Sequence, residues 1–341
     1  MNPVRNIKQN LNKKLEPCQQ ISNGVNLISR RTIKNLLQRY QIRPSKRLGQ
    51  NFLVDEGVIK RVIEAAQLSQ NDIVLEIGPG IGNLTMELAK RVKKVIAIEK
   101  DQKMVEILKE LLECANVRNV EIVKADILKI DPKPYTLKPY KVVANLPFYI
   151  TAPVIRKFLE AVEVKHRASA CGDEGKDEDK VLIAPQQMVL VVQKEVAQRI
   201  CAKAPDMSIL AVSVQFYAEP EIIFYISKKS FWPQPKVDSA IIKIIPRQPA
   251  PYRNEVSGAG FRERFFRIVK AGFSQPRKQI LNNFSEMLKL NKPRSERKSL
   301  LRGKDEARFW LLKNNINPTQ RAETLTIEDW INLTKSYKIK K

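Results

Sequence analysis

The chain has 341 residues, of which 43% are hydrophobic and 28% charged. This composition is ordinary for a globular protein, and at about 150 residues per domain the length suggests two domains. No stretch approaches the ~18 apolar residues of a membrane span, and the start lacks the apolar core of a secretory signal. We therefore expect a cytoplasmic protein with no membrane partner.

The charge is unevenly distributed. The chain carries 61 basic and 36 acidic residues, a formal net charge of +25. Residues 1–50 hold 11 basic and 1 acidic residue, residues 51–245 hold 28 and 26, and residues 246–341 hold 22 and 9. Two basic ends around a near-neutral middle favour a polyanionic partner, above all a nucleic acid.

Residue usage also excludes some chemistry. His166 is the one histidine, and it adjoins an acidic, polar segment. Reactions that need a histidine base or several histidine ligands are therefore not expected. The four cysteines form no C-x-x-C pair, so we expect no metal site.

In chain order, residues 1–28 are polar and predict a basic flexible tail, and a short helix follows over 30–40. From residue 57, helical stripes alternate with short apolar runs. The predicted strands are 73–77, 95–98, 120–123, 141–144 and 188–192, and the helices lie around 58–66, 84–92, 104–112 and 153–163. This alternation predicts an α/β fold with a doubly wound, mostly parallel, Rossmann-like sheet.

The pattern changes twice along the chain. Residues 165–184 are hydrophilic and acidic, and predict a surface insertion. Two β-rich runs, 211–226 and 238–245, predict an antiparallel hairpin at the sheet edge. After a proline-rich stretch near residue 250 the pattern is wholly helical, with helices predicted at 260–272, 276–289, 304–314 and 326–336. We therefore expect a first domain over 29–250 and a small all-helical, basic domain over 251–341.

Three features follow successive predicted strands. Gly78-x-Gly80-x-Gly82 follows the first strand and opens a helix, where glycines allow a sharp turn and close approach to a ligand. Glu99 ends the second strand, where a carboxylate can bind ribose hydroxyls, and Asp126 ends the third, where it can accept a hydrogen bond from an adenine. The alternative is a glycine turn with two surface carboxylates, but the combination favours nucleoside binding.

Glu76 is ambiguous, because it can contact the amino acid end of such a ligand or simply be a partnered carboxylate.

The tetrapeptide Asn145-Leu146-Pro147-Phe148 ends the fourth strand. The exocyclic amine of adenine is a poor nucleophile because its lone pair is conjugated with the ring. Acceptors for both N–H groups, such as the Asn145 side-chain oxygen and the Leu146 carbonyl, would favour a tetrahedral nitrogen. Phe148 could then stack on the extruded base. A proline turn with a buried phenylalanine explains these four residues equally well.

These motifs in this order resemble the adenosylmethionine-dependent amino-methyltransferases. Further motifs narrow the resemblance to the rRNA adenine N6-dimethyltransferases: Leu48-Gly49-Gln50-Asn51-Phe52-Leu53 and Phe231-Trp232-Pro233-x-Pro235-x-Val237-Asp238-Ser239. Arg321-Ala322-Glu323-Thr324-Leu325 is most similar to the bacterial small-subunit branch, which dimethylates two adjacent adenines. The resemblance spans about residues 30–337.

The resemblance implies roles for individual residues. Asn51 and Leu53 would close over S-adenosylmethionine, Gly78 would contact its methionine part, Glu99 its ribose and Asp126 its adenine. Asn145 would bridge the cofactor and the target amine, with Leu146 and Phe148 in the same catalytic loop. Phe231 would form the second wall of the base pocket, opposite Phe148. The implied partner is small-subunit rRNA within the small ribosomal subunit, near the 3′ end of the rRNA, and we expect a monomer.

Two other functions remain open. One is the related large-subunit rRNA methyltransferase that confers macrolide resistance, against which the segment from Arg321 to Leu325 argues. The other is a non-catalytic RNA-binding or ribosome-assembly factor on the same fold, which predicts a damaged cofactor site. A dehydrogenase is disfavoured, because the glycine spacing differs from G-x-G-x-x-G and no catalytic histidine is available.

Overall fold

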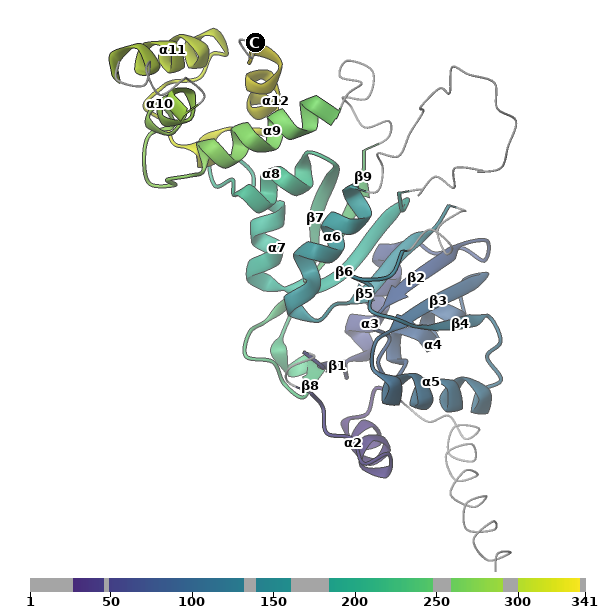
Figure 1. The fold of residues 1–341 in the computed structure, drawn as a ribbon. Helices are drawn as coiled ribbons and strands as arrows, with labels where there is room; N and C mark the ends of the chain where they lie inside the picture. The colour runs from purple at the N-terminus through teal and green to yellow at the C-terminus, as the bar shows by residue number, and fades with distance from the viewer. Residues whose placement is uncertain are drawn as a thin grey trace, which may run out of the picture. The chain divides into compact units, whose positions relative to one another are not determined.

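The computed structural model describes residues 27–45, 49–131, 139–160, 184–247, 259–290 and 300–337. The chain forms two compact units (Figure 1). The first comprises the described residues up to Ala197 with Glu221–Pro246, and the second comprises Gln198–Pro220 with the described residues from Arg247 onward. The predicted insertion at 165–184, except the buried Ala184, and nearly all of the predicted tail lie outside the described residues. Leu27 and Ile28, which we assigned to the tail, pack against the core instead.

The first unit is built on a seven-stranded sheet with the order β4-β3-β2-β5-β6-β9-β7 (Figure 1). The four pairings from β4 to β6 are parallel, and β9 is antiparallel to β6. The strands are β2 (Ile73–Ile77), β3 (Lys94–Glu99), β4 (Val120–Lys124), β5 (Lys141–Asn145), β6 (Gln187–Gln193), β7 (Ala218–Ile226) and β9 (Ser239–Pro246). The predicted doubly wound, mostly parallel sheet is confirmed.

The central strands are runs of branched apolar residues buried on both faces, as parallel strands covered by helices require. The covering helices are α3 (Glu56–Ala66), α4 (Asn83–Ala89), α5 (Gln102–Cys114) and α6 (Thr151–Glu160). One continuous core cluster joins α3, α4 and α5 to the sheet. Asp55 and Asp101 cap α3 and α5 by accepting hydrogen bonds from the backbone N–H groups of Val58 and Lys103. These elements agree with the predicted alternation.

Two short elements join sequence motifs that are far apart in the chain. β1 (Phe52–Leu53) and β8 (Phe231–Trp232) form an antiparallel pair in which Leu53 faces Phe231. Helix α2 (Arg30–Arg39) buries Ile33 and Leu37 in a cluster with Phe52 and residues of α5. The 3₁₀ turns η2 (Phe148–Ile150) and η4 (Lys228–Ser230) complete this region. No periodicity in the sequence indicated the β1–β8 pair.

The second unit is mainly helical. Its helices are α8 (Ile209–Gln215), α9 (Ala259–Gly272), α10 (Ile280–Leu290), α11 (Leu300–Lys313) and α12 (Ile327–Ser336), with the turn η6 (Ala322–Thr324); α7 (Lys194–Cys201) spans the division between the units. Its core is aromatic. Phe216 stacks on Phe265 with ring centroids 4.1 Å apart, and Trp330 lies between Phe273 and Phe284.

The predicted strand at 211–226 is wrong in its first part. Residues 209–215 form helix α8, because the Ser208 side chain accepts a hydrogen bond from the Ala211 N–H and caps the helix. The alternating, β-branched sequence of this segment favours a strand, but the cap and burial of Ala211, Val212 and Val214 favour the helix. The segment Gln198–Pro220, which we expected in the first domain, packs within the second unit.

Within the described ranges, no helix has the length and apolarity to cross a membrane.

Two glycines of α9 provide a matched test of packing in the second unit. A Cβ on Gly272 would lie 2.4 Å from the Trp330 ring, whereas a Cβ on Gly260 would meet nothing within 4 Å. Gly272→Ala should therefore destabilise the protein by ~1–3 kcal/mol through overpacking. Gly260→Ala should be neutral or stabilise it by up to ~1 kcal/mol, because alanine favours helix. Urea unfolding followed by tryptophan fluorescence measures both, and equal stabilities for the two variants would contradict this packing.

Candidate active site

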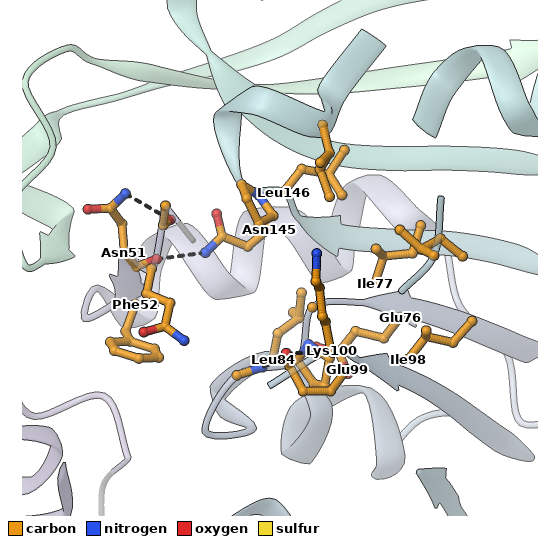
Figure 2. A pocket seen from close by; sticks show the side chains of 18 of the residues that line it. Asn51, Phe52, Glu76, Ile77, Leu84, Ile98, Glu99, Lys100, Asn145 and Leu146 are labelled. Atoms are coloured by element: carbon orange, nitrogen blue, oxygen red, sulfur yellow. Dashed lines mark hydrogen bonds between the residues drawn. The ribbon is translucent and has the colours of Figure 1, made fainter. Parts of the chain in front are cut away.

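A pocket lies at the carboxyl ends of β2, β3, β4 and β5, the place where open α/β sheets bind ligands. The structure brings all the predicted site residues to this one pocket. Its lining includes Asn51, Leu53, Glu76, Gly78, Glu99, Asp126, Asn145, Leu146, Phe148 and Phe231. Figure 2 shows several of these side chains around the pocket.

The glycine turn after β2 adopts a backbone that other residues rarely take. Gly78, Gly80 and Gly82 have φ angles of 69°, 59° and 90°, in the left-handed region that favours glycine. A Cβ on Gly80 would also lie 3.1 Å from the Phe52 ring. Glycine at this turn therefore keeps the backbone open toward the pocket and close to β1.

Glu99 holds this turn in place. Its Oε2 accepts a hydrogen bond from the Gly80 N–H at 3.1 Å, and its Oε1 accepts from the N–H groups of Lys100 and Asp101, each at 2.8 Å. Burial raises the pKa of Glu99, and the three N–H donors oppose this rise. The carboxylate thus has a structural task besides any contact with a ligand.

Asp126 forms an ion pair with a residue that sequence reasoning missed. Its Oδ2 lies 2.9 Å from the Lys100 ammonium, and its Oδ1 accepts a hydrogen bond from the Leu128 N–H. The hydrogen bond from Lys100 holds the pKa of Asp126 below its usual value. Lys100 lines the pocket, and its position directly after the strand-ending Glu99 was the available signal.

Glu76 is a buried carboxyl group in strand β2, with 1% of its surface exposed. Burial raises its pKa to about 8, and the Thr85 hydroxyl lowers it while the charge of Glu99 raises it further. Its Oε2 has no hydrogen-bond partner among the described residues. Burial therefore favours the neutral form of this carboxyl group in the folded protein.

Asn145 is oriented by the loop that precedes β1. Its Nδ2 donates a hydrogen bond to the Asn51 carbonyl at 3.0 Å, and the Asn51 side chain donates to the Gly49 carbonyl. Figure 2 shows the Asn145 amide nitrogen directed at Asn51, while its oxygen makes none of the drawn hydrogen bonds. Gly49 has a φ of 61°, and a Cβ there would lie 3.3 Å from Pro147.

The three apolar candidates differ in exposure. Leu146 and Phe231 are almost fully buried, each with 2% exposed, whereas Phe148 is half-buried. Phe231 packs in the core cluster with Leu53 and also lines the pocket.

Asn83 is a further residue of the pocket that sequence reasoning missed. It donates hydrogen bonds to the carbonyls of Leu27 and Leu53 and so holds the loop before β1.

The pocket suits a cationic nucleoside. Three carboxyl groups, Glu76, Glu99 and Asp126, stand at adjacent strand ends around a glycine turn with an open backbone. S-adenosylmethionine offers a sulfonium and an ammonium to such groups, and the unpartnered Glu76 oxygen is a buried acceptor for a cation. The residues therefore fit this cofactor.

The fold and this site define an S-adenosylmethionine-dependent methyltransferase. The family model described as "Ribosomal RNA adenine dimethylase" matches residues 42–338. The chain belongs to the ribosomal RNA adenine dimethylase family.

Similar proteins agree with this assignment. The ribosomal RNA small subunit methyltransferase A of Dehalococcoides mccartyi is 38% identical over 89% of this chain and 92% of its own length. The protein of the same name from Clostridioides difficile is 37% identical over 89% and 94%. Among solved structures, a dimethyladenosine transferase from Plasmodium falciparum matches with a TM-score of 0.63 and 26% identity, covering 83% of this chain and 95% of that one. The 23S rRNA methyltransferase ErmE matches with a TM-score of 0.61 and 26% identity, covering 84% and 98%.

The raised pKa of Glu76 predicts a pH-dependent stability. The folded protein keeps Glu76 protonated, whereas the unfolded chain ionises it above about 4.5. The stabilisation that the folded state gains by keeping Glu76 protonated is therefore fully present below pH 4.5 and is lost as the pH rises through about 8. Glu76→Gln mimics the protonated group and should become progressively more stable than the unchanged protein over this range. The test measures the unfolding free energies of both proteins without cofactor from pH 5 to 8.5. A difference between them that does not change with pH would contradict the prediction.

Proposed function

We propose that the enzyme transfers methyl groups from S-adenosylmethionine to the N6 amines of two adjacent adenines near the 3′ end of small-subunit rRNA. Two cycles on each base give N6,N6-dimethyladenosine. Curated relatives named for the small ribosomal subunit, 37–38% identical over most of the chain, support this substrate.

The orientation of the Asn145 amide is the observation that carries the proposal. Because Nδ2 donates to the Asn51 carbonyl, Oδ1 is left as an acceptor. Asn145 ends β5 and lines the same pocket as the three carboxyl groups and Phe148. An acceptor there can take a hydrogen bond from the adenine amine and turn the nitrogen lone pair toward the methyl donor. Such preorganised polar groups are the main catalytic device when no acid or base is required.

The neighbouring residues complete the base pocket. The Leu146 carbonyl would accept the second N–H of the amine, and Phe148 would stack on the flipped adenine. The Leu146 N–H donates to the Val191 carbonyl at 3.2 Å, which holds this loop against β6. Phe231 would close the pocket opposite Phe148, where its burial in the core cluster would hold the ring in place.

The cofactor is assigned to the residues around the glycine turn. Asn51 and Leu53 would cover it, Gly78 would adjoin its methionine part, Glu99 would bind the ribose and Asp126 the adenine. Bound here, the cofactor supplies an electrophilic methyl group on sulfur. Glu99 already accepts three N–H groups, so one further lone-pair direction serves the ribose. Lys100 would share Asp126 with the adenine amine.

Two observations weigh against the alternatives. Relatives that are 37–38% identical over most of the chain are named for the small subunit, which favours this function over the large-subunit one. A non-catalytic assembly factor would not need Asn145, Glu99 and Asp126 in one pocket.

The partner would be rRNA within the small ribosomal subunit. The basic excess of residues 246–341 would supply phosphate contacts, which position an RNA without reading its sequence. We expect the enzyme to act as a monomer in the cytoplasm.

Glu99→Ala should weaken cofactor binding by ~1–3 kcal/mol, because the ribose hydroxyl loses a buried acceptor. The same change also removes support for Gly80, so affinity alone cannot separate the two effects. Calorimetry with S-adenosylhomocysteine and its 2′-deoxy analogue separates them. The unchanged protein should discriminate between these ligands and Glu99→Ala should not; Glu106→Ala, an exposed change on α5, serves as control. Equal discrimination in all three proteins would refute the ribose assignment.

Asn145→Ala should slow methyl transfer by roughly 10²–10³, by analogy with the loss of one oxyanion-hole donor. Single-turnover methylation of small ribosomal subunits gives the rate, with cofactor affinity and melting temperature measured in parallel. A wild-type rate would exclude the catalytic role. Activity lost only in step with stability would instead assign the loop a structural role.

A further inference from the structure

Tyr149 differs from the other tyrosines that the structure describes. Tyr40, Tyr140, Tyr217, Tyr225 and Tyr337 each contact a charged or aromatic side chain. Within the described ranges, Tyr149 has neither a ring contact nor a hydrogen bond to its hydroxyl. Its side chain is 55% exposed and lines the pocket. Single exposed apolar side chains are common, so the place of this one at the pocket makes it informative.

The backbone that presents Tyr149 is held on both sides. The Ile150 N–H donates to the Pro147 carbonyl at 3.1 Å, and Ile150 is buried with 7% exposed. The Thr151 hydroxyl donates to the Phe148 carbonyl at 3.4 Å. Successive residues of a 3₁₀ turn project about 120° apart, so Phe148 and Tyr149 face different directions. The ring is thus an exposed platform on a well-anchored turn, directly after the residue assigned to the flipped base.

Base flipping leaves an unstacked base beside the flipped one, on which an exposed aromatic ring can stack. When an adenine leaves its stack, the adjoining base loses its neighbour and exposes a face to water. We propose that Tyr149 stacks on the base adjoining the flipped adenine, so that the enzyme recognises a pair of purines rather than one base. This inference rests on the proposed function and specifies how the second adenine of the pair is held while the first is methylated.

The test compares Tyr149→Ala with Tyr149→Phe, using Tyr225→Ala as the matched control. Tyr225 is 48% exposed on β7 but does not line the pocket. Loss of one base–aromatic stack should raise the KM for small ribosomal subunits by roughly 5- to 150-fold in Tyr149→Ala, with cofactor affinity unchanged. Tyr149→Phe should restore the wild-type KM within about twofold, because stacking does not need the hydroxyl. Tyr225→Ala should leave KM unchanged.

Subunits assembled on transcripts whose neighbouring adenine is replaced by uracil complete a double-mutant cycle. Methylation is then followed at the retained adenine. The effect of Tyr149→Ala on KM should shrink on the uracil transcript, because a smaller base gains less from the platform. An effect of equal size on both transcripts, or an unchanged KM on the adenine pair, would overturn the inference.

The two proposals fail in different ways. If the wild-type enzyme does not methylate these subunits, the proposed function fails and this inference fails with it. If the wild-type enzyme and Tyr149→Ala methylate them with the same KM, only the role of Tyr149 is refuted.

Discussion

The short antiparallel pairing of β1 with β8 is the interaction on which the active site depends. It places Leu53 opposite Phe231. The next residues extend the contact, because the Val54 N–H donates a hydrogen bond to the Ser230 carbonyl at 2.9 Å. The Ser230 hydroxyl also donates to Asp55, the residue that caps α3. Because Asn51 directly precedes this pair, its carbonyl is held where it can orient the Asn145 amide. A few hydrogen bonds thus join the loop before β1 to β8 and to the end of β5.

The carboxyl groups of the pocket contrast with the basic charge of the chain. The chain as a whole is strongly basic, as a ligand of RNA should be, yet its cofactor is itself a cation. Three carboxyl groups line the pocket at adjacent strand ends, and one of them, Asp126, is paired with Lys100. Glu99 remains anchored by backbone N–H groups, whereas Glu76 is kept neutral by burial. The pocket therefore avoids the repulsion of three fixed charges before a ligand arrives.

Local patterns in the sequence predicted most of the sheet and most of the site. Buried parallel strands are continuous apolar runs, and their carboxyl ends meet at one edge, so the positions of Glu99, Asp126 and Asn145 followed from strand order alone. The β1–β8 pair could not be predicted by periodicity, because each strand has two residues and the partners are nearly 180 positions apart. Helix α8 was missed because its cap, Ser208, was overlooked beside β-branched residues. The position of Lys100 directly after Glu99 places it at the strand ends, but its pairing with Asp126 depends on side-chain packing between two strands that local patterns do not report.

Helix α2 packs against the loop before β1 and against the glycine turn. Ile33 and Leu37 of this helix share a core cluster with Phe52, which follows Asn51 in the loop, and with Ile81, which lies in the glycine turn. Asn83 binds the carbonyls of both Leu27 and Leu53, so the segment before α2 and the loop have one anchor in common. Fraying of α2 would remove the apolar contacts that Ile33 and Leu37 make in this cluster. The packing of the loop before β1 is therefore coupled to the fraying of α2, the first helix among the described residues.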